Sequence, residues 1–504
     1  MKIEARSPSA AADRGESRRP DRWLRWAVPA GATALACVLA VGCEPGASPS
    51  GPAAGGPAAA AVSSSAGPFQ FVQFELGAEP GTTCPSGPGC TNRAAEPAIR
   101  ADGAGNFYVT SELGLSAGTL AWKSADGGLH YTALTSPNQL STSSEDLAPG
   151  GGDTDLATAP EPNADGVHNV YVASLSLADV TVSASVDGGA TWSRNVTSAT
   201  IPGDDREWIA ADGASKVCIS YHDVVTFNIE VSCSFDAGAS FTQVGTAIDA
   251  EHAWLIDDNA IGNLAIDPSD HTVYQSLSGI GSAAEAVVAG PAFHAVWIAV
   301  SHDGGQTFTD YAVHIDEDTS RDFGHQFVNV TVDRAGTVYV VYSDDHHLYY
   351  SFSGDHGRTW TGPLRIDQSP SETSIMPWSV ACDPGQLDVV WYGTPFYADT
   401  LSPDTYPASA AWRVYFAQNR KADEAGTRFS QGAATPVVHY GGVCESGVTC
   451  TGNRDLYDDF GVAVDPTTGR ASIAYSDDQP GNTGSDDHTA VATQTAGSGI
   501  CPGS

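Results

Sequence analysis

The chain is poor in positive charge: 23 Lys and Arg residues stand against 60 Asp and Glu residues among 504. The formal net charge is −37, and because residues 1–42 carry +3, the remainder carries −40. Such an acidic body repels phosphate backbones and anionic membrane surfaces at long range. We therefore expect no nucleic-acid partner, and any arginine in the body of the chain becomes conspicuous.

The chain also lacks an apolar run long enough to cross a bilayer as a helix. Its longest stretch, Ala27–Val41, is about 15 residues, whereas a spanning helix needs about 20, and it follows a basic segment that begins at Arg18. This pattern is typical of an export signal. The stretch ends in Leu-Ala-Val-Gly before Cys43, which resembles a bacterial lipobox with Cys43 as the lipidated residue. Ordinary secretion with cleavage nearby is the alternative.

These features predict three parts of the chain and an exported, membrane-anchored location. Residues 1–43 form a lipoprotein signal peptide, and residues 44–68, rich in Ala, Gly, Pro and Ser, form a disordered tether. Residues 69–504 form the folded domain. The membrane is expected to be contacted through the lipid alone, and the protein is expected to be a monomer.

Cysteine is sparse, but its arrangement is informative. Ten cysteines occur; Cys37 lies in the signal and Cys43 would take the lipid, so eight remain. An even number in an exported protein predicts disulfides. The expected pairs are Cys84 with Cys90, Cys444 with Cys450, Cys218 with Cys233 across a hairpin, and the two left over, Cys382 with Cys501. No Cys-x-x-Cys or clustered Cys/His spacing supports a metal site instead.

One turn recurs five times with the pattern Ser-x-Asp-x-Gly-x-x-aromatic. The copies begin at Ser124, Ser185, Ser234, Ser301 and Ser353, and the gaps between their aspartates are 61, 49, 67 and 52 residues. A sixth, damaged copy spans Asp423 to Phe429. The Asp and Ser side chains can bond backbone N–H groups, and Gly supplies the positive φ that a tight hairpin needs. A fixed motif at this period indicates a repeat architecture.

The five turns resemble the Asp-box, or BNR, repeat of the sialidase-like β-propellers. The resemblance covers about residues 69–495 and implies an all-β propeller of four-stranded blades. It also implies that the Asp-box aspartates are structural, on the face away from the active site.

A second repeat consists of an apolar strand, an Asp-containing turn and another strand, and it occurs seven times. The first copy spans Ala98–Val109 and the last Gly461–Tyr475. A lone alternating strand at Phe71–Leu76 precedes the series, and Thr489–Thr495 follows it. We therefore predict a ring closed by its two ends, because closure removes unpaired sheet edges. Seven blades are favoured over six.

Residues just before each inner strand of a propeller converge on one pocket. In this chain those positions are rich in charged and aromatic residues. They are Asn92, Arg93, Glu96, Asp153, Asp155, Asp204–Trp208, Asp257–Asn259, Arg321, Asp322, His325, Met376–Trp378, Asn453–Asp455 and Tyr457–Asp459. Arg93, Arg206, Arg321, Arg454, Trp208, Trp378 and Asp458 are therefore candidate ligand-binding residues. Each arginine could instead pair with a neighbouring acid and hold a loop.

The resemblance also implies roles at such a site, since sialidases hold the sialic-acid carboxylate with three arginines and use a Tyr nucleophile backed by Glu. By residue type, Arg93, Arg206 and Arg454 would form the triad. Tyr457 with Glu207 would form the nucleophilic pair, and Asp155 or Asp205 would be the acid. The expected function is that of an exo-glycosidase on extracellular glycans or glycoproteins. A non-catalytic carbohydrate- or protein-binding propeller and a structural or assembly factor at the cell surface are the alternatives.

No cofactor motif is present in the sequence. Gly-x-Ser-x-Gly, P-loop and His-Glu-x-x-His patterns are all absent. The acidic pairs Asp477-Asp478 and Asp486-Asp487 could bind calcium through carboxylate oxygens, although they lack the spacing of a regular calcium loop. We therefore expect neither a resident metal nor a cofactor.

Overall fold

The computed structural model describes residues 63–78, 80–81, 92–114, 117–138, 150–176, 179–199, 204–288, 290–445, 447, 450–478 and 487–501. The signal segment, Cys43, Cys84, Cys90 and Asp486 lie outside the described residues. Within them the regular structure is β-strand, apart from two 3₁₀ turns, η2 (Ala253–Leu255) and η3 (Pro403–Thr405).

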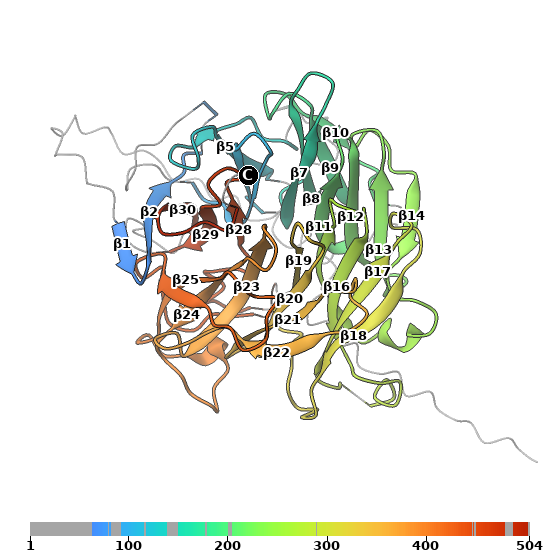
Figure 1. Ribbon diagram of the computed structural model, residues 1–504, viewed down its shortest axis with the longest axis vertical. Helices are drawn as coiled ribbons and strands as arrows, with labels where there is room; N and C mark the ends of the chain where they lie inside the picture. The colour runs from blue at the N-terminus through green and yellow to red at the C-terminus, as the bar shows by residue number, and fades with distance from the viewer. Residues whose placement is uncertain are drawn as a thin grey trace, which may run out of the picture.

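The strands form seven antiparallel sheets set around an axis (Figure 1). From the axis outwards, the first blade contains β3 (Ala95–Ala101), β4 (Phe107–Glu112), β5 (Thr119–Ser124) and β6 (Thr132–Ala133). The second contains β7 (Thr154–Pro162), β8 (His168–Leu175), β9 (Val180–Ser185) and β10 (Ser193–Asn195). The third contains β11 (Asp204–Asp212), β12 (Lys216–Asp223), β13 (Ile229–Ser234) and β14 (Gln243–Thr246). The fourth contains β15 (Asn259–Ile266), β16 (Val273–Gly279), β17 (Ala295–Ser301) and β18 (Thr309–Ile315).

The remaining blades follow the same order. The fifth contains β19 (Asn329–Val332), β20 (Val338–Ser343), β21 (Leu348–Ser353) and β22 (Thr361–Arg365). The sixth contains β23 (Thr373–Ala381), β24 (Leu387–Thr394), β25 (Ala411–Asn419) and β26 (Ser430–Ala433), with β27 (His439–Tyr440) paired to β25. The seventh contains β28 (Gly461–Val464), β29 (Ala471–Asp477), β30 (His488–Ala496), β2 (Phe69–Glu75) and β1 (Ser63–Ala66). The prediction of a seven-bladed all-β propeller is confirmed.

The two ends of the described chain close the ring. Strand β2 pairs antiparallel with β30, with Phe71 opposite Gln494 and Phe74 opposite Val491, and the blue and red strands lie side by side in Figure 1. The inner strands contact one another in sequence around the axis, and the last, β28, contacts the first, β3. Closure by the terminal strands is therefore as predicted.

The N-terminal edge of the folded part lies earlier than the sequence indicated. Strand β1, Ser63–Ala66, pairs with β2, with Ser63 opposite Val72. It falls in the range assigned to the tether, because a segment of Ser and Ala carries no apolar alternation to mark it as a strand. No helix among the described residues has the length and apolar character needed to cross a bilayer.

The five predicted Asp-box turns share one hydrogen-bond pattern. In each, the Ser Oγ donates to the Asp Oδ1 at 2.7–2.8 Å, and the Gly N–H donates to the Ser Oγ at 2.8–3.0 Å. Each turn joins the third and fourth strands of one of the first five blades. Since successive strands are antiparallel, these turns lie on the face opposite the starts of the inner strands. The seventh blade has no such turn, because its third and fourth strands come from opposite ends of the chain.

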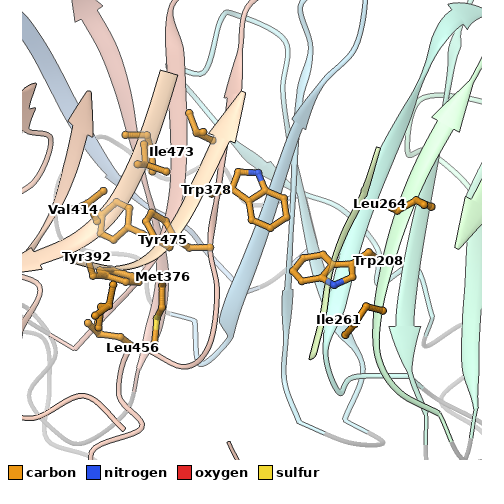
Figure 2. Packing of buried hydrophobic residues seen from close by; sticks show 14 of the residues in the cluster. Trp208, Ile261, Leu264, Met376, Trp378, Tyr392, Val414, Leu456, Ile473 and Tyr475 are labelled. Carbon is orange, nitrogen blue, oxygen red and sulfur yellow. The ribbon is translucent and has the colours of Figure 1, made fainter. Parts of the chain in front are cut away.

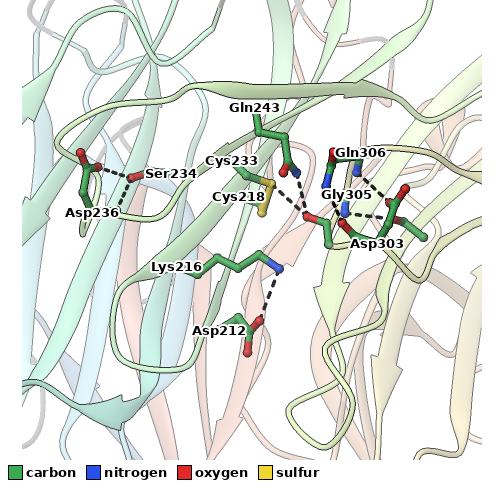
Figure 3. Close-up of a disulfide and its surroundings, with 12 residues drawn as sticks. Asp212, Lys216, Cys218, Cys233, Ser234, Asp236, Gln243, Asp303, Gly305 and Gln306 are labelled. Carbon is green, nitrogen blue, oxygen red and sulfur yellow. Dashed lines mark hydrogen bonds and ion pairs between the residues drawn. A yellow bond between two sulfur atoms is a disulfide. The ribbon is translucent and has the colours of Figure 1, made fainter.

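Three of the predicted disulfides are present. Cys218 pairs with Cys233 across β12 and β13, Cys382 with Cys501, and Cys444 with Cys450. Figure 3 shows the first beside the Asp-box turns of the third and fourth blades, where the Gln243 side chain donates to the carbonyl oxygen of Gly304 at 2.9 Å. The fourth predicted pair involves the cysteines outside the described residues.

Candidate functional site

Irregularities in the inner strands turn charged side chains toward the axis. The register of β3 shifts between Ala95 and Ala98, and that of β11 shifts around Arg206. Glu96 and Arg206 adopt φ values of 50° and 55°, a left-handed conformation that is unfavourable for residues other than glycine. Bulges of this kind redirect a side chain and occur often beside active sites. Met376, at φ 53°, occupies the equivalent position in β23.

Two arginines from different blades converge on one buried carboxylate. Glu96 is fully buried, and it lies 3.4 Å from the Arg454 guanidinium and 3.8 Å from that of Arg206. Arg206 also pairs with Asp459 at 2.5 Å and Asp153 at 3.3 Å. Arg454 pairs with Asp458 at 2.6 Å. The positive charges at this face are therefore matched by the protein's own acids.

Three carboxylates from the first two blades form the centre of this network. Glu96, Glu112 and Asp153 each place an oxygen within 4.8 Å of the others. Burial and the charge of Asp153 raise the pKa of Glu112 to about 8. Burial alone would raise the pKa of Asp153, but the guanidinium groups of Arg206 and Arg454 lower it below its ordinary value. At neutral pH Glu112 therefore carries a proton and Asp153 a negative charge.

Burial dominates the remaining acids of this face. Burial and Asp153 raise the pKa of Glu207 well above its ordinary value, and neither of its carboxylate oxygens has a hydrogen-bond partner among the described residues. Burial and Asp153 raise the pKa of Asp205 to about 7, and burial raises that of Asp459 to about 7. Several protons are thus held here at neutral pH.

Tyr457 lies at this face, next to the Arg454 guanidinium. It is half-buried at φ 57°, with the Arg454 guanidinium 4.9 Å from its ring centroid. Burial raises its pKa to about 12, and Glu112 contributes the largest further rise. The predicted partner, Glu207, is influenced instead by Asp153 and Arg206.

Asp155 is held in place by the strands. It accepts from the Arg100 guanidinium at 2.9 Å and from two backbone N–H groups, those of Leu156 at 2.8 Å and Ile209 at 3.2 Å. Burial raises its pKa. A carboxylate with this many partners links the first three blades and has little capacity left for a substrate.

The two candidate tryptophans close the axis instead of lining a surface. Trp208 is 1% exposed and Trp378 is 5% exposed, and their ring centroids lie 5.2 Å apart across the axis (Figure 2). Phe327 packs edge-on against Trp208 at 5.4 Å. The Arg206 guanidinium lies 4.2 Å from the Phe327 ring and 4.5 Å from the Trp208 ring. These rings therefore form an apolar floor beneath the charged network.

The other two candidate arginines are placed differently. Arg93 is exposed in the segment before β3. Arg321 pairs with Asp316 at 3.2 Å and Asp344 at 2.8 Å, within the fourth and fifth blades. The predicted triad is thus represented at the centre by a pair, Arg206 and Arg454.

Glu112 was not among the predicted site residues. It is the last residue of β4, the second strand of its blade, and it ends at the face where the inner strands begin. It therefore does not precede an inner strand, the position that the predicted site residues share. An acidic residue closing an otherwise uncharged strand, Phe107–Ser111, is the signal that could have identified it.

Among the described residues, five groups of three side chains could hold a metal ion. They are Glu96/Glu112/Asp153, His325/Asp345/Glu445, His439/Asp455/Asp478, Glu75/Asp477/His488 and Asp249/His252/Asp310. In the first group Arg206 and Arg454 already supply positive charge. Asp477 and Asp478, one of the pairs considered for calcium, fall into two different groups, and Asp478 lies 2.9 Å from His439.

No family model and no curated protein matches this sequence. Similar solved structures include a protein of unknown function from Dyadobacter fermentans, with 11% identity over 84% of this chain and 98% of that one and a TM-score of 0.44. An α-L-arabinanase from Penicillium chrysogenum has 12% identity over 84% and 97% and a TM-score of 0.44. A Hadza microbial sialidase has 10% identity over 80% and 66% and a TM-score of 0.40. Scores this low carry no argument about function, so the fold rests on the strand pairing described above.

Proposed function

We propose that this protein is an exported propeller that hydrolyses extracellular glycans at its axial face, with Glu112 as the proton donor and Asp153 as the ionised carboxylate. The observation that carries the proposal is the opposite shift of two neighbouring pKa values, upward for Glu112 and downward for Asp153. Glycoside hydrolysis needs one protonated and one ionised carboxyl group on either side of the scissile bond. The sequence resemblance to Asp-box propellers supports the same class of substrate.

The spacing of the pair favours hydrolysis with retention of configuration. Carboxyl groups about 5–5.5 Å apart are typical of retaining enzymes, whereas inverting enzymes leave about 6.5–9.5 Å for a water molecule. Oxygens of Glu112 and Asp153 lie within 4.8 Å of each other. We therefore assign Asp153 as the nucleophile, and Glu112 would then protonate the leaving oxygen.

An uncharged glycan fits this face better than sialic acid. Arginine binds a carboxylate through its two-pronged guanidinium group, and those of Arg206 and Arg454 are engaged by Glu96, Asp153, Asp458 and Asp459. A substrate carboxylate would also meet the protein's net negative charge. In this proposal Tyr457 contacts the sugar and is not the nucleophile.

A binding propeller without catalysis is the second candidate. Trp208 and Trp378 are buried in the core, and both central arginines form ion pairs with acids. These features also suit a rigid scaffold that presents its loops to a glycan or a protein. Glu112 and Asp153 would then serve only to hold the first two blades together.

Export and anchoring are part of the proposal. Three disulfides fit an oxidising compartment. We infer lipidation at Cys43 from the sequence that precedes it, which places the propeller at a bacterial cell surface on a tether.

The test is a panel of fluorogenic neutral glycosides and sialosides, with a glycan-array binding screen in parallel. We expect turnover of a neutral glycoside and none of the sialosides. Asp153→Asn and Glu112→Gln should each lower kcat by about 10²–10⁴-fold, the usual contribution of such groups. Asp355→Asn, on the opposite face, is the matched control and should leave kcat unchanged.

Two results would reject this assignment. Turnover confined to sialosides, with loss in Tyr457→Phe, would restore the sialidase mechanism. Array binding without any turnover in the wild-type protein would support the binding propeller.

A further inference from the structure

A second cluster of chemically active side chains lies on the axial face, outside the network of Arg206 and Arg454. His325 precedes β19, Asp345 lies in the turn between β20 and β21, and Glu445 lies in the segment between β27 and β28. Three separate parts of the chain therefore contribute one side chain each. None of the three has a role in the proposed hydrolysis.

The donor atoms of this cluster are close enough to share one ion. One atom from each residue lies within 4.8 Å of the other two, and His325 Nδ1 lies 2.5 Å from Asp345 Oδ2. Three ligands bound to one tetrahedral ion at about 2.0–2.2 Å lie about 3.3–3.6 Å apart. Side-chain movements of about 1 Å, which open the contact between His325 and Asp345 and bring the third atom closer, would therefore let one ion bind all three.

The side chains are held in position by their neighbours. Glu445 is 8% exposed, and the Gln326 amide donates to it while accepting from the backbone N–H of Met376 at 2.6 Å. Cys444, the residue before Glu445, is fixed by its disulfide with Cys450. Such outer contacts orient the ligands in metal sites.

The cluster contains more carboxyl groups than an ion pair with one histidine requires. One imidazole needs one carboxylate, whereas three carboxyl groups, those of Asp345, Glu445 and Asp322, lie around a single histidine here. Asp345 Oδ1 is buried and has no hydrogen-bond partner among the described residues, and Asp345 adopts φ 70°. In the Asp249/His252/Asp310 group Asp310 Oδ1 likewise has no hydrogen-bond partner among the described residues, but each aspartate accepts from the backbone N–H of the other. Of the five groups found in the described part of the chain, only the cluster at His325 combines a buried glutamate held by Gln326 with an aspartate oxygen that lacks a hydrogen-bond partner.

We propose that His325, Asp345 and Glu445 bind a first-row divalent metal ion, with Zn²⁺ or Mn²⁺ as the fitting class. An imidazole nitrogen with two carboxylates suits these ions, whereas Ca²⁺ and Mg²⁺ prefer oxygen ligands alone. Three protein ligands leave a coordination position open for water or a substrate hydroxyl. Gln326 is a positioning residue, because it touches Glu445 and not the ion.

The test is metal titration of the full-length chain after removal of bound metal with EDTA. Calorimetry and elemental analysis with ZnCl₂ and MnCl₂ should show one more equivalent bound by the wild-type protein than by His325→Ala or Glu445→Gln. Gln326→Ala should retain that equivalent with an affinity about 10–100-fold lower, as is usual for outer contacts. His346→Ala is the matched control, since its ring contacts the carbonyl oxygen of Leu401 and lies outside the cluster.

Equal stoichiometry in the wild-type protein, His325→Ala and Glu445→Gln would overturn the proposal, as would the absence of saturable binding. Cobalt absorption supplies a readout independent of folding, because the spectrum of bound Co²⁺ reports nitrogen and oxygen ligation. A spectrum unchanged in folded His325→Ala would likewise overturn it. These outcomes do not depend on whether the protein hydrolyses glycans.

Discussion

The two faces of the propeller both carry acidic side chains, but the pKa values of these side chains are shifted in opposite directions. On the Asp-box face, the Thr359 hydroxyl and backbone N–H hold the pKa of Asp355 at about 2. On the axial face, burial raises the pKa of Glu112 to about 8 and those of Asp205 and Asp459 to about 7. Hydrogen bonds from close neighbours stabilise the charged form on one face, and desolvation stabilises the neutral form on the other.

The partners of these acids come from different distances along the chain. Each Asp-box aspartate accepts from residues two to four positions away. Glu96 accepts from Arg454, which is 358 positions away. The repeated motif therefore identifies the turns that build the ring. The acids with raised pKa values lie at positions that are not the same from one blade to the next.

The largest effect in this comparison is expected from Glu96, where two arginines meet an internal carboxylate. Burial raises the pKa of Glu96 well above its ordinary value, so Glu96 acts here as a buried acceptor for the Arg454 guanidinium and the backbone N–H of Asp458. Leaving a buried donor without its partner costs about 1–3 kcal/mol, so Glu96→Ala, which removes the acceptor of two donors, should lower the free energy of unfolding by about 3 kcal/mol. Glu96→Gln should lower the free energy of unfolding by less, since its amide oxygen can still accept from Arg454 and from the backbone N–H of Asp458. Urea unfolding at pH 7 measures both.

The same variant tests whether Glu96 occupies an anion site. Acetate should raise the thermal midpoint of Glu96→Ala in a concentration-dependent way and have no such effect on the wild-type protein. Sodium chloride at equal ionic strength is the control. An equal response to both salts, or an unchanged unfolding free energy, would mean that the two arginines are satisfied without Glu96.

The fold was predictable because its determinants are local. Each Asp box specifies a turn within eight residues, and each inner hairpin specifies two strands. The alternating strand at Phe71–Leu76 indicated closure, because a single strand at one end of the chain completes the three at the other. Strand β1 was missed, since Ser63–Ala66 pairs through its backbone and has no distinctive pattern.

The candidate site was predictable only in part. Placement of Arg454 and Tyr457 at this face follows from their positions before an inner strand, and that of Arg206 from its position at the start of β11. Which acids influence Tyr457 depends on bulges and on the angles between blades, which no local pattern encodes. The tryptophans at 208 and 378 lie across the axis from each other, and a sequence cannot show whether such rings line a pocket or fill it.

A smaller effect is expected from the proton held by Glu112. Its pKa is raised from an ordinary value of 4.5 to about 8, so its contribution to stability is complete below pH 4.5 and is lost as the pH rises to about 8. Glu112→Gln removes this loss, and at pH 8 it should be more stable than the wild-type protein by an amount on the order of 2 kcal/mol. Unfolding measured from pH 5 to 8 gives the difference. If the two proteins respond identically to pH, Glu112 is not a protonated carboxyl group.

The smallest effect is expected on the opposite face, with the opposite sign. The pKa of Asp355 is lowered from 3.8 to about 2, so its contribution is present above pH 3.8 and is lost as the pH falls through 2. Asp355→Asn should cost about 0.5–1 kcal/mol at pH 7, a value kept low by solvent screening, and nothing at pH 2. Asp165→Asn, an exposed aspartate in another turn, is the matched control. A larger cost at pH 2 than at pH 7 would contradict the division of the two faces into ionised turns and protonated centre.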